Sequence, residues 1–141
     1  MAVSLYEHNE RAYRRAAELM EETGKAAGIH PTGTGKSFIG FKLCEENEGK
    51  KVCWLSPSET IFRTQLNNLK KVSNGYVPAN IAFYTYAGLM LRSEEEIGKI
   101  GADYIILDEF HRCGAKQWGK GVHALLKTHP AARVLGLSAT N

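Results

Sequence analysis

The segment AAGIHPTGTGKS, residues 26–37, decides the fold of this chain. Its apolar start, from Ala26 to Ile29, predicts a strand, residues 31–35 predict a glycine-rich loop, and a helix is expected from Lys36 to about Asn47. Successive backbone N–H groups in such a loop can surround an anion, and the start of the helix adds its own unpaired N–H groups. The segment therefore predicts a phosphate-binding loop between a strand and a helix.

The residue types of this loop fit a nucleoside triphosphate with magnesium. The expected cofactors are ATP and Mg²⁺, with Lys36 reaching the β- and γ-phosphates and the Ser37 hydroxyl binding the metal. The other residues expected to hold the phosphates are Thr32, Gly33, Thr34 and Gly35. The general pattern G-x-x-x-x-G-K-[ST] has glycine where this chain has His30, so its strictest form is not met. The alternative is a flexible turn that merely contains a lysine, which the strand–loop–helix context disfavours.

The rest of the chain continues the alternation of helices and strands. Further helices are expected at Leu5–Glu22, from the cap residue Ser58 to Lys71, at Ser93–Ile97 and at Gln117–Lys127. Further strands are expected at Val52–Leu55, Ile81–Thr85, Tyr104–Leu107 and Ala132–Leu137. Several strands are apolar at every position, as strands are when helices cover both faces of a parallel sheet. We therefore expect one α/β domain over residues 1–141, a three-layer sandwich with a mainly parallel sheet.

An acidic pair, Asp108 and Glu109, follows the apolar run Tyr104–Leu107. Ligands of such sheets bind at the carboxyl ends of the strands, which is where this pair lies. Neighbouring residues of an extended chain point to opposite sides. We therefore expect Asp108 to serve Mg²⁺ through its water shell, and Glu109 to polarise the water that attacks the γ-phosphate. The alternative is a solvated acidic turn, which the phosphate loop earlier in the chain disfavours.

Composition limits the class of protein without naming a partner. The formal net charge is +3 and the pI is near 8.8, which is weak evidence for an anionic partner. The cysteines Cys44, Cys53 and Cys113 are odd in number and lack a CxxC spacing, so disulfides and zinc are disfavoured and a cytoplasmic location is expected. No apolar run reaches the roughly 18 residues of a membrane span, so no membrane partner is expected.

Three motifs in order resemble those of superfamily-two helicases and translocases, the DEAD/DEAH-box class. PTGTGKS (residues 31–37) is similar to their first motif, DEFH (108–111) to their D-E-x-H box, and SAT (138–140) to their S-A-T motif. The resemblance covers essentially the whole chain and implies a RecA-like P-loop NTPase fold. The D-E-x-H box with this loop is closer to DEAH-like DNA translocases, such as restriction-enzyme motor subunits, than to RNA-unwinding DEAD-box proteins. DNA is therefore favoured over RNA as the partner.

The resemblance also implies roles for residues outside the phosphate site. In this family the S-A-T strand lies between the phosphate-loop strand and the acidic strand. Ser138 and Thr140 would then lie beside His111 and couple the nucleotide state to the grip on nucleic acid. Loops after the second and third strands, here 56–58 and 85–87, would contact the nucleic-acid backbone. The contact residues expected there are Pro57, Ser58 and Thr85. The alternatives are a packed histidine and ordinary helix caps or turns.

The chain departs from the family pattern upstream, and it lacks the family's second lobe. No glutamine precedes the phosphate loop to read adenine, although the amide of Asn9 could pair with it. A solvated helix start explains Asn9 nearly as well, so adenine specificity stays open. Arg63 and Gln65 receive no assignment. The second lobe supplies arginines that reach the γ-phosphate, but this chain ends at Asn141, directly after S-A-T. The resemblance thus implies a first lobe that alone binds Mg–ATP weakly and turns it over poorly.

Two other functions stay open at this stage. A small-molecule kinase would explain the phosphate loop, but not the D-E-x-H box together with S-A-T. A nucleotide-binding module with little activity of its own would fit the isolated lobe, although Lys36, Ser37, Asp108 and Glu109 together argue against lost chemistry in the parent protein.

Overall fold

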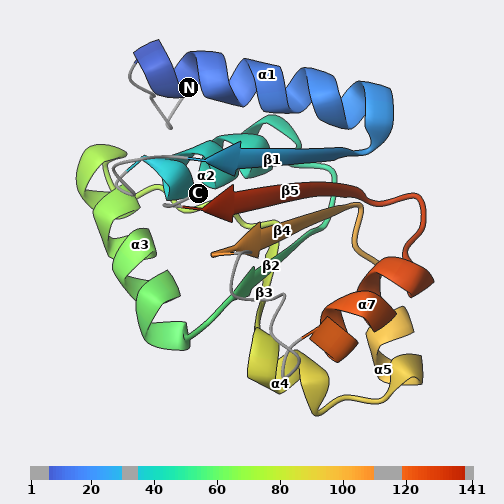
Figure 1. Ribbon diagram of the computed structural model, residues 1–141. Coiled ribbons are helices and arrows are strands. Elements are labelled where there is room, and N and C mark those ends of the chain that lie inside the picture. The colour runs from blue at the N-terminus through green and yellow to red at the C-terminus, as the bar shows by residue number, and fades with distance from the viewer. Residues whose placement is uncertain (1–6, 30–34, 110–118, 139–141) are drawn as a thin grey trace.

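Helices and strands alternate along the chain in the computed structural model, which describes residues 7–29, 35–109 and 119–138 (Figure 1). The strands are β1 (Lys25–Ile29), β2 (Val52–Ser56), β3 (Ile81–Thr85), β4 (Tyr104–Asp108) and β5 (Arg133–Ser138). The helices are α1 (Glu7–Thr23), α2 (Lys36–Glu46), α3 (Glu59–Val72), α4 (Tyr86–Met90), α5 (Glu94–Gly98) and α7 (Gly119–Thr128).

The five strands form one parallel sheet in the order β1-β5-β4-β2-β3. The arrows of β1, β5 and β4 point the same way in Figure 1, and every pairing is parallel, so the carboxyl ends of the strands share one edge of the sheet. The α/β class is therefore confirmed. The sheet was expected to be mainly parallel, and all of its described strands are parallel. The order also confirms that β5, which ends at the first residue of the S-A-T sequence, lies between β1 and β4.

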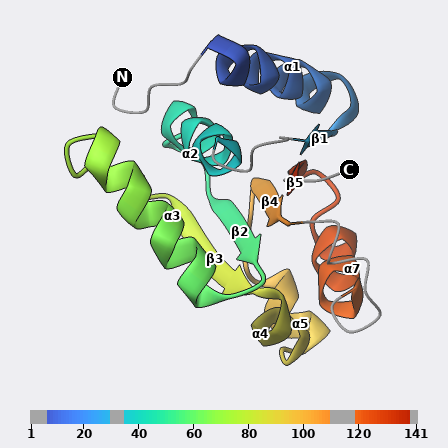
Figure 2. The ribbon, with the colours of Figure 1, turned by 60° about the vertical axis from the view of Figure 1, so that its left-hand side comes forward.

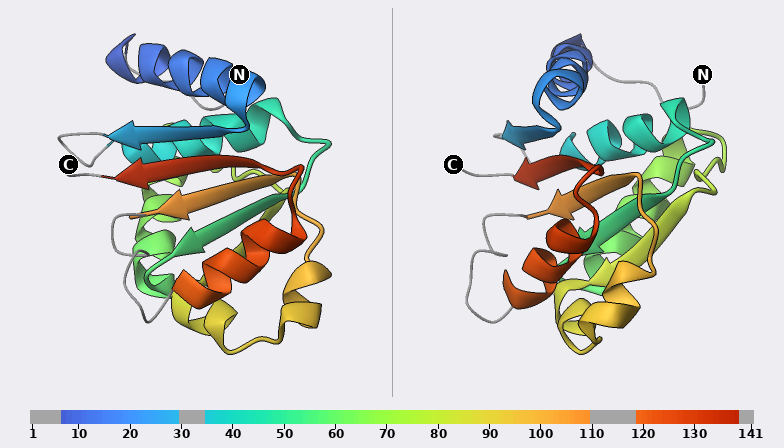
Figure 3. Two further views of the ribbon diagram at one scale, coloured as in Figure 1. Left: turned by 45° about the vertical axis from the view of Figure 1, so that its right-hand side comes forward. Right: turned by 90° about the vertical axis from the view of Figure 1, so that its right-hand side faces the viewer.

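Helices cover both faces of the sheet. Helices α2 and α3 lie on one face, and α4, α5 and α7 on the other (Figures 2 and 3), while α1 packs beside β1 and α2. The central strands β2 and β4 are buried at every residue, whereas the edge strand β3 is only partly buried throughout. This pattern explains why the central strands are apolar without alternation.

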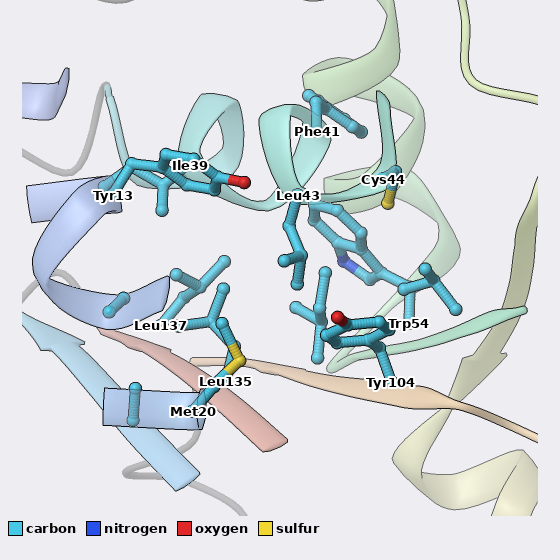
Figure 4. Close-up of a cluster of buried hydrophobic side chains, with 14 of the residues drawn as sticks. Tyr13, Met20, Ile39, Phe41, Leu43, Cys44, Trp54, Tyr104, Leu135 and Leu137 are labelled. Carbon is cyan, nitrogen blue, oxygen red and sulfur yellow. The ribbon is translucent and has the colours of Figure 1, made fainter. Parts of the chain in front are cut away.

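Alternate residues of each strand build two separate cores. Trp54, Ile106 and Leu135 are neighbours across the sheet and pack against α1, α2 and α3 (Figure 4). One residue earlier on the same strands, Cys53 and Ile105 pack with α4, α5 and α7 on the opposite face. The period of two along a strand thus divides one apolar sequence between two layers.

Helix α2 is the most buried helix of the described chain, with eight of its eleven residues buried. A Cβ atom on Gly40 would lie 2.6 Å from the Trp54 ring, and this ring in turn stacks on Phe41 at 4.8 Å between centroids. Glycine therefore lets α2 approach the sheet closely. The result is that the first turn of α2, with Lys36 and Ser37, is held rigidly at the edge of the sheet.

The expected caps are confirmed, but one short helix differs from expectation. Ser58 caps α3 by accepting a hydrogen bond from Ile61 N at 3.1 Å, and Ser93 forms the expected capping box with Glu96. The expectation of a loop at 85–87 is wrong, because Thr85 ends β3 and caps α4, so that Tyr86 is already helical. Burial of Tyr86 and Leu89 stabilises this five-residue helix, which is too short to leave a periodic pattern in the sequence.

No helix within the described ranges combines the length and the apolar character that a membrane crossing requires.

Candidate functional site

The carboxyl edge of the sheet collects the described site residues. Gly35 precedes α2, Lys36 and Ser37 occupy its first turn, Asp108 ends β4, and Glu109 follows it. Both Lys36 and Ser37 are buried, at 5% and 6% exposure. Residues that are 72 positions apart in the sequence are thus brought together where a parallel sheet binds its ligands.

Lys36 pairs with both members of the acidic pair. Its Nζ lies 2.7 Å from Asp108 Oδ1, and it also forms an ion pair and hydrogen bond with Glu109 Oε1. The Asp108 side chain is fully buried and the Glu109 side chain is only 16% exposed. Charges removed from water in this way need close, well-formed pairing, and here one ammonium group serves two carboxylates.

The backbone at Glu109 explains how both carboxylates reach the same ammonium group. Glu109 has a φ of 55°, in the left-handed region that residues with a side chain rarely adopt. The chain therefore leaves the extended conformation directly after Asp108. The expectation that the two carboxylates point to opposite sides is wrong, since that rule holds only while the strand continues. Such a conformation costs of order 1–3 kcal/mol and is typical of functional sites.

Two residues without a predicted role hold Asp108 in place. Gln65 Nε2 donates to Asp108 Oδ2 at 3.0 Å, and the Tyr86 hydroxyl donates to the Asp108 main-chain carbonyl at 2.7 Å. A sequence signal for Gln65 exists, because it lies between Phe62 and Leu69 at helical spacing, on the buried stripe of α3. A polar residue on such a stripe needs a partner. Tyr86 carries no comparable signal, because it belongs to the unexpected helix α4.

The described donors fit a magnesium ion bound together with phosphates. The Ser37 hydroxyl, in the first turn of α2, and the Asp108 carboxylate, at the end of β4, are oxygen donors of the kind that Mg²⁺ prefers, and the helix dipole at the start of α2 favours phosphate. No group of three or more His, Cys, Asp or Glu side chains within the described part of the chain could hold a metal by itself.

Asn9 packs against the end of the phosphate loop. It is 2% exposed, and a Cβ atom on Gly35 would overlap its carboxamide. Gly35 is therefore required to be glycine by the approach of α1, in addition to any need for backbone contact with phosphate. Burial of Asn9 contradicts the alternative of a solvated helix start, and adenine specificity stays open.

The predicted nucleic-acid residues lie at the carboxyl ends of β2 and β3, the two strands on one side of β4. Pro57 and Ser58 link β2 to α3, and both are partly buried. The Ser58 Oγ caps α3, and the Thr85 Oγ1 accepts from Gly88 N at 2.9 Å to cap α4. Capping, the alternative explanation, is thus present at both hydroxyls. Contact with nucleic acid stays a prediction, and the cap geometry is compatible with it.

Several predicted site residues lie outside the described residues. These are Thr32, Gly33 and Thr34 in the phosphate loop, His111 in the acidic box and Thr140 in the S-A-T motif. For Ser138 the structure describes only its place as the last residue of β5, paired in register with Ile29 of β1.

The described cysteines are not candidate nucleophiles or metal ligands. Cys44 and Cys53 are free and buried on opposite faces of the sheet. Burial raises the pKa of each thiol to about 12, so the reactive thiolate is scarce at neutral pH.

Comparison with solved structures shows the same fold in motor proteins. The crystal structure of the Escherichia coli DEAH/RHA helicase HrpB matches with a TM-score of 0.72 and 19% identity, covering 93% of this chain and 19% of that chain. The Sulfolobus solfataricus SWI2/SNF2 ATPase core in complex with dsDNA matches with a TM-score of 0.69 and 12% identity, covering 100% of this chain and 33% of that chain. This chain therefore spans a fifth to a third of these structures. None of the curated proteins compared with it matches.

The parallel sheet, the cluster of Lys36 with Asp108 and Glu109, and the family match together define the class of protein. The chain is a RecA-like, ATP-binding lobe of a superfamily-two helicase or translocase. The family model described as "Type III restriction enzyme, res subunit" matches residues 2–141. The chain belongs to this family, which confirms the resemblance drawn from the three motifs.

Proposed function

We propose that this chain is the first lobe of a motor that hydrolyses ATP with Mg²⁺ to move along nucleic acid. The observation that carries the proposal is the convergence of Lys36 from α2 with Asp108 and Glu109 from the end of β4. Membership of the res-subunit family supports it. The cluster brings together a lysine for the phosphates, a carboxylate for the metal and a second carboxylate for the water, which are the groups that phosphoryl transfer uses.

Each residue of the cluster has a distinct role in this proposal. Lys36 holds the β- and γ-phosphates, Ser37 and Asp108 hold Mg²⁺, and Glu109 orients the attacking water and accepts its proton. Mg²⁺ supplies neutralisation of the phosphate charge. Lys36 can exchange its carboxylate partners for phosphate because its flexible four-carbon stem lets the ammonium group move. The phosphate-loop residues Thr32, Gly33, Thr34 and Gly35 complete the cradle.

The proposal assigns coupling to His111, Ser138 and Thr140. The sheet register supports it, because Asp108 is paired with Leu137, and Ser138 is therefore level with the turn at Glu109. Nucleic acid is proposed to contact Pro57 and Ser58, which follow β2, and Thr85, which ends β3; both strands lie on the same side of β4. A cytoplasmic location remains a prediction.

We propose that the motor moves along DNA and that a second lobe completes its ATP site. The family description concerns restriction enzymes, the D-E-x-H sequence resembles DEAH-type motors, and the SWI2/SNF2 structure holds double-stranded DNA. Residues 1–141 supply one wall of an ATP site whose other wall carries arginines in two-lobed motors. The lobe alone is therefore expected to bind Mg–ATP weakly and to respond little to DNA or RNA.

The test is ATP turnover by the full-length protein with double-stranded DNA, single-stranded DNA and RNA compared side by side. We expect DNA to raise the rate, phosphate to be released to water, and Lys36→Ala to weaken nucleotide binding. Transfer of phosphate to a small-molecule acceptor would show a kinase instead. Strong nucleic-acid-stimulated turnover by residues 1–141 alone would contradict the requirement for two lobes.

A further inference from the structure

Gln65 contacts the site without a role in the proposed chemistry. Its Nε2 donates to Asp108 Oδ2 at 3.0 Å, while Asp108 Oδ1 accepts from Lys36 Nζ at 2.7 Å. Each oxygen of the fully buried carboxylate thus has its own donor, from a different helix. Together the two hydrogen bonds fix the rotation of the Asp108 side chain.

The orientation of the Gln65 amide follows from chemistry. An ionised carboxylate offers acceptors only, so the NH₂ group of Gln65 must face Asp108. Its Oε1 then lies buried, without a hydrogen-bond partner in the described ranges. Buried polar atoms are rarely left in this state, because they lose their contact with water and gain nothing in return. An apolar side chain would pack at this place without that cost, so packing alone does not account for glutamine here.

Tyr86 holds Asp108 at its main chain rather than at its carboxylate. The Tyr86 hydroxyl donates to the main-chain carbonyl of Asp108 at 2.7 Å, and so fixes the end of β4 rather than the carboxylate. Gln65 acts on the carboxylate itself. Their two effects are therefore separable by experiment.

We propose that Gln65 is a positioning residue, which holds the Asp108 carboxylate in the orientation that serves Mg²⁺ and ties it to helix α3. The inference rests on the proposed function, because it adds a residue to the same site. Helix α3 begins after Ser58, and Gln65 lies seven residues, or about 10 Å, further along it. The helix thus connects the proposed nucleic-acid contact directly to the metal carboxylate.

The experiment uses Gln65→Met in the full-length protein. Methionine keeps the length and helix propensity of glutamine but removes the donor. We expect the affinity for a fluorescent, non-hydrolysable ATP analogue to fall about 10- to 100-fold in Mg²⁺, the usual loss when a partner of a metal ligand is removed, and to stay unchanged in EDTA. The control is Asn67→Met, an exposed position of the same helix, which should leave both affinities unchanged.

A titration of Mg²⁺ against ATP turnover separates positioning from misfolding. If Gln65 positions Asp108, raising the Mg²⁺ concentration restores turnover in Gln65→Met by mass action, which cannot rescue an unfolded variant. Equal affinity losses with and without Mg²⁺, wild-type affinity in both, or low turnover at every Mg²⁺ concentration would overturn the inference and leave the proposed function intact. A wild-type protein that binds no Mg–nucleotide would instead reject the proposed function itself.

Discussion

At the residue scale, the centre of the site is a single ammonium group between two carboxylates. Lys36 neutralises Asp108 where the latter is fully buried, and it also pairs with Glu109. Removing either carboxylate leaves one ion pair in place, whereas removing Lys36 leaves two neighbouring negative charges without their shared cation. The residues of this cluster are therefore not equivalent in their effects on binding, folding and chemistry.

Glu109→Gln should separate binding from hydrolysis. The amide keeps the shape of the side chain and leaves the Lys36–Asp108 pair intact, but it cannot accept a proton from water. We expect nucleotide affinity in the full-length protein within a few-fold of wild type and turnover reduced by about 10²–10⁴. Affinity is measured by fluorescence titration and turnover by phosphate release. Parallel loss of affinity and turnover would remove Glu109 from its assigned role.

Residue identities at this site could be predicted from the sequence, but their geometry could not. The position of Lys36, Asp108 and Glu109 after apolar strands was enough to select them. The turn at Glu109 depends on a positive φ at a residue other than glycine, which no local pattern indicates. The contact of Gln65 with Asp108 cannot be predicted from the sequence, because the two residues are 43 positions apart and only the packing of α3 on the sheet brings them together.

At the element scale, helix N-termini lie beside the carboxyl edge of the sheet. Helices α2, α3 and α4 follow β1, β2 and β3, and each begins no more than seven positions after the end of its strand. The caps of α3 and α5 could be predicted, because Ser58 and Ser93 precede suitable helix starts. Helix α4 could not, because its five residues include Gly88 and its formation depends on burial of Tyr86 against the end of β4.

Substitutions at Ser58 can separate its cap from its proposed contact with nucleic acid. Aspartate and asparagine are both good caps, but only aspartate brings a negative charge that repels phosphate. We expect Ser58→Asp to keep the stability of the wild type while weakening DNA binding, measured by urea denaturation and fluorescence anisotropy. Ser58→Asn is the neutral control and should keep both properties.

Removal of the cap should affect stability instead. Ser58→Ala is expected to lower the free energy of unfolding by about 1 kcal/mol, because the Ile61 N–H loses its acceptor. If Ser58→Asp binds DNA as tightly as Ser58→Asn, residue 58 caps α3 but does not contact nucleic acid.

At the scale of the whole molecule, the sheet has two cores that each bury a cysteine. Cys44 belongs to the core beneath α1, α2 and α3, and Cys53 to the core beneath α4, α5 and α7. Burial raises the pKa of each thiol to about 12, compared with 9.0 for the unperturbed group. The native state therefore keeps these protons at a pH where the unfolded chain has lost them.

Stability should consequently fall in alkaline solution. The contribution of the raised thiol pKa values is complete below about pH 9 and is lost as the pH rises toward 12. At about pH 10.5 the loss should be on the order of 2 kcal/mol for each thiol, measured by urea denaturation under reducing conditions. The double variant Cys44→Ala and Cys53→Ala should show a shallower decline. An equal decline in both proteins would place the alkaline sensitivity elsewhere.

The parallel arrangement of the whole sheet is what brings the distant motifs together. Five strands that run the same way collect the ends of β1, β4 and β5 at one edge, whatever their separation in the sequence. The class of the fold could be predicted for this reason, and the family resemblance implied the place of β5 between β1 and β4. The central claim is therefore spatial: one metal–nucleotide complex binds at this edge, in contact with both α2 and the end of β4.

Paramagnetic broadening by Mn²⁺–ATP tests this claim most directly. Mn²⁺ replaces Mg²⁺, and the amide NMR signals of the protein report their distance from the metal. We predict the strongest broadening at Ser37 and Asp108 and the weakest at Gly49 and Asp103, at the opposite edge of the sheet, with the effect lost in Lys36→Ala. Bound Mn²⁺–ATP that broadens Gly49 and Asp103 while sparing Ser37 and Asp108 would contradict the account.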